Sequence, residues 1–169
     1  MSEISVELFD SRKNILSINL NGIVQSITID MIKSIWQGVS DDELEYIEYV
    51  DAEVCDNLVS CCITVASGQG GIVFVWDVTK KQFVHYSNGE FAVKVRVYNQ
   101  HVYILREISY WGVKAHLRLD ICPLGIKSMD ESGLEIPLDN EMKFKLADND
   151  ESYFIDLCDG SPMVRISHE

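Results

Sequence analysis

Apolar and polar residues alternate along much of this chain with the two-residue period of β-strands that are buried on one face. The clearest case is residues 14–30, which carry Asn21-Gly22 near their centre, a pair that favours the two-residue turn of a β-hairpin. Such a turn pairs Leu20 with Ile23 and gathers most apolar residues of the two strands on one side. We therefore expect an N-terminal hairpin that packs one face on a core.

The pattern changes over residues 31–50, where it favours one or two short helices. Asp30 can cap the first of them. Ser40 and Glu43 have the spacing of a capping box, which predicts that a second helix starts at Ser40. Residues 44–54 fit either a continuation of that helix or a strand. The apolar face of the first helix is formed by Ile32, Ile35 and Trp36.

Strand patterns return after Cys61 and continue to Cys122. Residues 72–78 are almost continuously apolar, which is typical of a strand buried on both faces. Asn88-Gly89 is a second hairpin signal, and Asn99-Gln100 marks a further tight turn. A hairpin at Asn88-Gly89 would pair the strand ending there with the next strand, as part of an antiparallel meander of about five strands.

The fold class that follows is mainly β, or a β-rich α+β variant of it. We expect an antiparallel meander sheet, barrel- or sandwich-like, with one or two short helices near residues 31–50. A last hairpin is predicted between residues 152–157 and 163–166. The length of 169 residues is that of one ordinary domain, so residues 1–169 are expected to form a single domain.

Charge and cysteine content restrict the setting. The chain has 27 acidic and 14 basic residues and a net charge of −13, which disfavours nucleic acids and anionic membranes and favours a basic protein partner. The N-terminal residues lack the pattern of a secretory signal, and no apolar run has the length of a membrane helix. Five cysteines without CxxC spacing indicate free thiols. We expect a cytoplasmic protein; the oligomeric state stays open.

The densest charge is a run of carboxylates without any Lys or Arg among them. Three interpretations remain open: a solvated helix face, a docking patch for a basic partner, or metal binding. The candidate partner-binding residues are Asp41, Asp42, Glu43, Glu45, Glu48, Asp51 and Glu53.

A second candidate surface lies on the predicted meander of residues 81–118, whose outer face is expected to collect cations, imidazoles and aromatic rings. Such groups can bind anionic or planar ligands, and an amphipathic sheet surface covered by acidic segments is the alternative interpretation. The candidate ligand-binding residues are His85, Lys94, Arg96, Tyr98, His101, Tyr103, His116 and Arg118.

No sequence motif indicates catalytic residues, a metal site or a cofactor; the phosphate-binding loop and the zinc-protease helix, for example, are missing. The leading functional hypothesis is a non-enzymatic protein-interaction module, in the form of an acidic cytosolic inhibitor or immunity-type protein that neutralises a basic partner. The alternative is a small-molecule or anion-binding domain, which could be an enzyme, on the meander surface.

Overall fold

The computed structural model describes residues 3–8, 14–109, 111–112, 116–129, 134–136, 151–158 and 161–168, and for the last three of these segments it describes the backbone alone. The strands are β1 (Ile4–Leu8), β2 (Asn14–Leu20), β3 (Ile23–Thr28), β4 (Tyr49–Cys55), β5 (Leu58–Val65), β6 (Gly70–Asp77), β7 (Gln82–Asn88), β8 (Ala92–Tyr98), β9 (His101–Ile108), β10 (His116–Pro123), β11 (Leu134–Ile136), β12 (Glu151–Cys158) and β13 (Ser161–His168). The helices are α1 (Ile29–Ile35), α2 (Asp41–Glu45) and the single 3-10 turn η1 (Ala66–Gly68).

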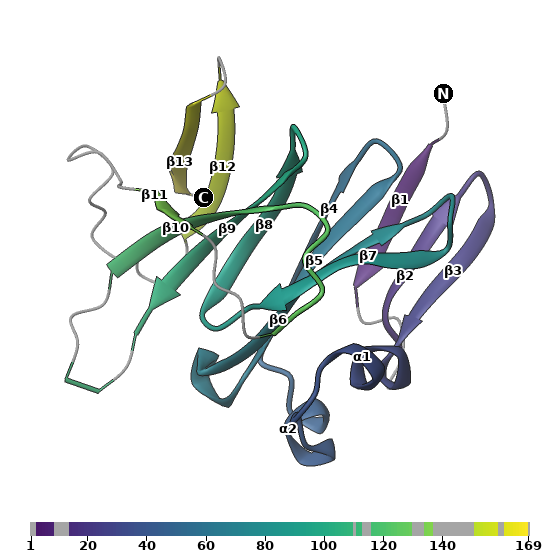
Figure 1. The fold of residues 1–169 in the computed structure, drawn as a ribbon, viewed down its shortest axis with the longest axis horizontal. Coiled ribbons are helices and arrows are strands. Elements are labelled where there is room, and N and C mark those ends of the chain that lie inside the picture. The colour runs from purple at the N-terminus through teal and green to yellow at the C-terminus, as the bar shows by residue number, and fades with distance from the viewer. Residues whose placement is uncertain are drawn as a thin grey trace.

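The strands form antiparallel sheets that pack as layers, so the mainly β, sandwich-like prediction is confirmed (Figure 1). Sheet β1-β2-β3 lies on one side, sheet β4-β5-β6-β7 in the middle, and sheet β11-β10-β9-β8 on the other side. The predicted C-terminal hairpin is the pair β12-β13. The two sides of the middle sheet face two separate apolar cores.

The middle sheet explains the continuous apolar run of residues 72–78. Phe74 and Trp76 face the core shared with β1–β3 and the helices, whereas Val73 and Val75 face the core shared with β8–β10. A strand between two apolar layers has no solvent face and therefore no polar alternation.

The hairpin predicted at Asn21-Gly22 is present with the expected register. Leu20 pairs with Ile23, Asn21 has φ 52° and Gly22 has φ 88°. Both values lie in the left-handed region that this turn requires. Trp76 donates its indole N–H to the side-chain oxygen of Gln25 at 2.8 Å, which ties this hairpin to the middle sheet.

The hairpin predicted at Asn88-Gly89 is wrong. β7 pairs with β6 and β8 pairs with β9, so this dipeptide carries the chain from the middle sheet to the outer one. The glycine is needed for close packing: a Cβ on Gly89 would lie 2.5–2.8 Å from backbone atoms of Ile72. The Gly89 N–H donates to the carbonyl of Gly71 at 2.9 Å and holds the crossing there.

The helices span residues 29–35 and 41–45, close to the prediction, with one change of cap. Thr28, rather than Asp30, caps α1: its hydroxyl accepts from the backbone N–H of Met31 at 3.2 Å. Ser40 and Glu43 form the predicted capping box of α2. Because α2 ends at Glu45 and β4 begins at Tyr49, the open choice for residues 44–54 resolves mainly to strand.

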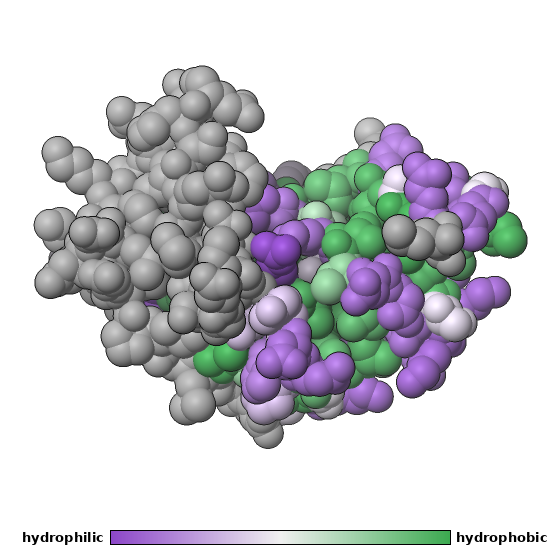
Figure 2. Space-filling view, turned by 90° about the horizontal axis from the view of Figure 1, so that it is seen from above, coloured by the Kyte–Doolittle hydropathy of each residue, from purple (hydrophilic) through white to green (hydrophobic). Residues whose placement is uncertain are grey.

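The surface is mixed in character. Seen from above, the described residues form a mosaic of hydrophilic and apolar patches (Figure 2). Among the described residues, none of the helices is long and apolar enough to cross a membrane. Exposed apolar side chains include Ile23 and Val24 at the β2–β3 turn.

Candidate functional site

The outer sheet meets the middle sheet along a polar boundary, here called the β4–β8 seam. β8 is an edge strand of its sheet. Two of its carbonyls accept side-chain hydroxyls in place of a neighbouring strand: Val93 from Tyr49 at 2.7 Å and Val95 from Ser60 at 3.3 Å. Hydroxyl donors thus satisfy carbonyls that a lone edge strand would leave open.

Ion pairs extend the seam and use part of the predicted acidic patch. Lys94 lies 3.0 Å from a carboxylate oxygen of Asp51, and Arg96 lies 3.4 Å from one of Glu53. Burial raises the pKa of both carboxyl groups, and the neighbouring cation opposes that rise in each case. Asp51 and Glu53 are therefore half-buried partners of two cations that the sequence assigned to the second candidate surface.

The rest of the acidic run belongs to α2 and the residues after it. Asp41 pairs with Lys33, and the Glu43 carboxylate accepts the Ser40 N–H of the capping box at 3.1 Å. The remaining members of the run before β4 are exposed, and no ion pair joins them to another described residue. We call these residues the α2 patch: Asp42, Glu45 and Glu48.

The eight residues of the second candidate surface do not come together. Lys94, Arg96, Tyr98, His101 and Tyr103 share one face of the outer sheet, since Arg96 pairs with Tyr103 and Tyr98 with His101 as predicted. The expectation that His116 and Arg118 join that face is wrong, because the register places them on its other side. Arg118 there binds Asp120, together with the buried Arg106.

His85 is also separated from the second candidate surface, because it lies fully buried on β7. Its Nδ1 accepts the Gly125 N–H at 3.2 Å, so the other nitrogen carries the proton and donates to Ser87 Oγ at 3.0 Å. Cys122 Sγ lies 3.9 Å from Nε2. Burial lowers the pKa of His85 to about 4. The imidazole is thus a neutral bridge, sealed from solvent.

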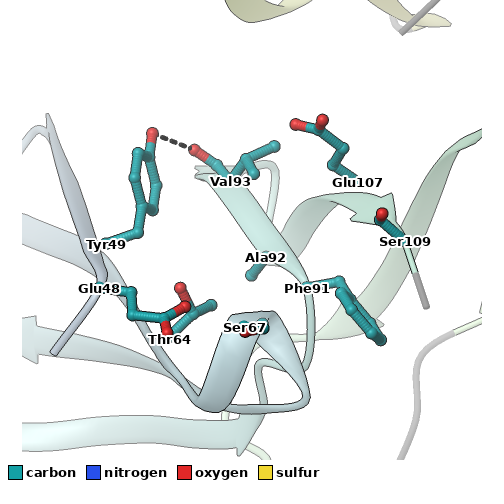
Figure 3. A pocket seen from close by; sticks show the side chains of 10 residues that line it. Glu48, Tyr49, Thr64, Ser67, Phe91, Ala92, Val93, Glu107 and Ser109 are labelled. Atoms are coloured by element: carbon teal, nitrogen blue, oxygen red, sulfur yellow. Dashed lines mark hydrogen bonds between the residues drawn. The ribbon is translucent and has the colours of Figure 1, made fainter. Parts of the chain in front are cut away.

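A pocket of about 310 Å³ opens at one end of the β4–β8 seam (Figure 3). Glu48, Tyr49 and Thr64 form the wall on the middle-sheet side, whereas Glu107 of β9 and Ser109 just after it form the wall on the outer-sheet side. Ser67 of η1 lies at its base, and the remaining lining residues are Gly68, Phe91, Ala92 and Val93. We call this cavity the seam pocket.

Acceptors dominate the chemistry of the seam pocket. It contains two carboxylates, those of Glu48 and Glu107, and no Lys, Arg or His lines it among the described residues. Burial raises the pKa of Glu107. Burial and nearby acidic groups, Glu107 included, raise the pKa of Tyr49, so its hydroxyl stays protonated and bound to Val93. A negative pocket of this kind suits a cationic group.

Unusual backbone conformations hold the walls in place. Ser67 and Phe91 have φ of 57° and 58°, values that non-glycine residues rarely adopt. The Phe91 N–H donates to Gly68 at 2.7 Å, and Phe91 in turn accepts from the Glu107 N–H at 2.9 Å. A bulge lies between Ala92 and Lys94 and takes the intervening Val93 out of the β8–β9 ladder. Strain and bulges of this kind are concentrated at binding sites.

Sequence reasoning found one residue of the seam pocket, Glu48, and missed the others. The pocket draws on segments around residues 48, 66, 91 and 108, which only the layer packing brings together. The sequence feature that bears on the pocket is the glycine-rich stretch of residues 68–71. In the structure this stretch connects β5 to β6 through the end of η1.

Other chemistry is limited in the described part of the chain. No group of three or more His, Cys, Asp or Glu residues there could hold a metal ion. Cys61 and Cys62 are buried on opposite faces of β5, and burial raises the pKa of both thiols. Comparisons with protein families, with curated proteins and with solved structures found no match to the chain.

Proposed function

We propose that this chain is a non-enzymatic interaction module that binds and neutralises a basic protein, in the manner of an acidic inhibitor or immunity-type protein. The observation that carries the proposal is the division of the acidic run. Asp41, Asp51 and Glu53 form ion pairs with cations of the same chain, whereas the exposed carboxylates of the α2 patch form none with another described residue. Exposed carboxylates near one another repel, and a cationic partner relieves that repulsion.

An aromatic side chain accompanies the patch. Tyr46 follows Glu45 directly and is 71% exposed, a high value for such a large apolar ring. Tyrosines are enriched among residues that dominate binding energy at protein interfaces. The carboxylates would speed the encounter with a basic partner, and the exposed ring would pack against it once it is bound.

The environment of the reactive side chains supports the non-enzymatic part of the proposal. Cys122 and His85 lie within 3.9 Å of each other, but the thiol is 2% exposed and the imidazole fully buried. The His85 ring already accepts from Gly125 and donates to Ser87. A nucleophile needs both a free base and access to substrate, and this pair offers neither.

The test compares two triple variants with the same change of charge. D42N/E45Q/E48Q neutralises the α2 patch, and E3Q/E7Q/D56N neutralises three exposed carboxylates outside it. Each protein is immobilised and used to capture proteins from a native lysate at low and high salt, followed by mass spectrometry. A captured basic protein is then purified and its Kd measured over a salt series.

We expect the α2-patch variant to bind the basic protein at least tenfold more weakly and with a shallower salt dependence, because the lost charges steer the encounter. The control triple should bind much like the wild type. Equal weakening in both variants would mean that net charge alone acts, and unchanged binding in the α2-patch variant would refute the proposed surface.

A further inference from the structure

We infer that the seam pocket is a receptor for a single lysine side chain presented by the basic partner. This inference rests on the proposed function and deepens it, because it names the group that the acidic surface recognises. Glu48 belongs to both the α2 patch and the seam pocket, so the two features meet at one residue. A partner guided by the patch would therefore reach the mouth of the pocket.

The walls select for a cation. Glu48, which directly precedes β4, and Glu107 of β9 line the cavity from different walls, and neither forms an ion pair with another described residue. An anionic ligand would meet two carboxylates without a balancing cation, which is costly in a partly buried site. The hydroxyls of Thr64, Ser67 and Ser109 add further oxygen acceptors around the space.

The dimensions select for one side chain. About 310 Å³ lies at the lower end of the range for ligand pockets, roughly 300–1,000 Å³. The Tyr49 ring forms part of the wall beside Val93 and Ala92, which gives a methylene chain apolar contacts. A lysine can bury its four-carbon stem against such a wall while the ammonium stays at the polar end.

The arrangement of acceptors favours lysine over arginine. A guanidinium binds best to a carboxylate that meets it in one plane with two parallel hydrogen bonds. Here the acceptors diverge, with Glu48 on one wall, Glu107 on the other and Ser67 at the base (Figure 3). The three donors of an ammonium point in different directions and can reach acceptors on separate walls.

The experiment titrates the ¹⁵N-labelled full chain with N-acetyl-lysine methylamide and follows amide shifts by NMR. We expect saturable shifts at Ser67, Gly68, Phe91 and Val93, with a Kd on the order of millimolar, as befits one isolated side chain. The Nε-acetylated form of the same probe and the norleucine analogue are neutral controls. Neither should change the chemical shifts of these amides.

Glu107→Gln tests the pocket apart from the α2 patch, because Glu107 lies outside the acidic run. The variant should bind the lysine probe about tenfold more weakly, while Glu3→Gln, a neutralised exposed carboxylate elsewhere, should bind it normally. The dispersion of the amide spectrum checks that each variant is folded. Absent shifts at the pocket amides, equal shifts with the norleucine analogue, or full binding by E107Q would each overturn the inference.

Spermidine provides the arm that separates a protein side chain from a free polyamine. If spermidine saturates the same amides at a tenfold lower concentration than the lysine probe, the assignment to a protein partner is overturned.

Failure of the pocket can be distinguished from failure of the proposed function. If the α2-patch variant loses the partner while E107Q binds it normally, the interaction surface stands without the pocket.

Discussion

The buried histidine of β7 predicts a specific loss of stability in acid. His85 titrates near 6.5 when exposed, whereas burial lowers its pKa to about 4 in the folded protein. Between these values the unfolded chain binds a proton that the folded chain excludes, so the free energy of unfolding falls as the pH falls. The difference of about 2.5 pKa units corresponds to about 3 kcal/mol, lost between pH 6.5 and pH 4.

The structural cause lies in the hydrogen bonds of the imidazole. Nδ1 accepts from the Gly125 N–H, so a proton placed on Nδ1 would face another donor. Nε2 already donates to Ser87. The protonated ring would thus lose one hydrogen bond and bring an unbalanced charge into a fully buried position.

The assay measures urea unfolding of the wild type and of His85→Gln at half-unit steps from pH 8 to pH 4.5. The carboxyl groups of Asp51, Glu53 and Glu107, whose pKa values are raised by burial, titrate in both proteins and contribute a change of the opposite sign. Subtracting one curve from the other removes them. The wild type should lose stability relative to the variant by about 1 kcal/mol per pH unit below pH 6.5. Parallel curves over this range would refute the assignment.

Two further predictions concern charge and close packing. Asp120→Asn should cost about 3–5 kcal/mol of unfolding free energy in chemical denaturation, because it leaves the buried Arg106 without its 2.6 Å carboxylate partner; a cost below about 1 kcal/mol would contradict this. Gly89→Ala should lower the unfolding free energy by more than about 3 kcal/mol, because its Cβ meets the Ile72 backbone. Gly22→Ala, which has open space at φ 88°, should cost only about 1–2 kcal/mol. Equal denaturation midpoints for the two variants would contradict the close contact at Gly89.

Local signals in the sequence were sufficient for much of the fold. Alternation, the capping box at Ser40 and the turn at Asn21-Gly22 each depend on neighbours within a few residues, and each predicted element is present. The register of β8 and β9 also followed from the short turn at Asn99-Gln100. Interactions of this range are encoded by residue type and spacing alone.

The packing of the sheets against one another could not be predicted from such local signals. Asn88-Gly89 has the composition of a hairpin turn. Its glycine, however, lets the backbone pass close to that of Ile72 in the middle sheet, where the chain crosses to the outer sheet. The wrong hairpin then placed His85 on the same face as Lys94. Because this one connection was predicted wrongly, the buried His85 was assigned to the second candidate surface.

The seam pocket shows the same dependence on long-range packing. Glu48 and Glu107 are far apart in the sequence, and neither carries a local pattern that marks it for a shared cavity. Ion pairs across the seam were equally hidden, since Lys94 and Asp51 were assigned to two different candidate surfaces. Charge composition indicated that acids and bases would meet, but only the packing of β8 against β4 decides which ones.

Ion pairs between described residues use more basic than acidic side chains. The ion pairs in which both partners are described use five of the 14 basic residues but only four acidic ones, because Arg106 and Arg118 share Asp120. Outside these pairs the chain therefore has 23 acidic residues and nine basic ones. The fold thus places several of its cations where they stabilise the seam and the outer sheet, at sites of limited exposure. A field of this sign attracts cationic proteins from a distance and weakens with added salt, which is the behaviour expected of the proposed inhibitor.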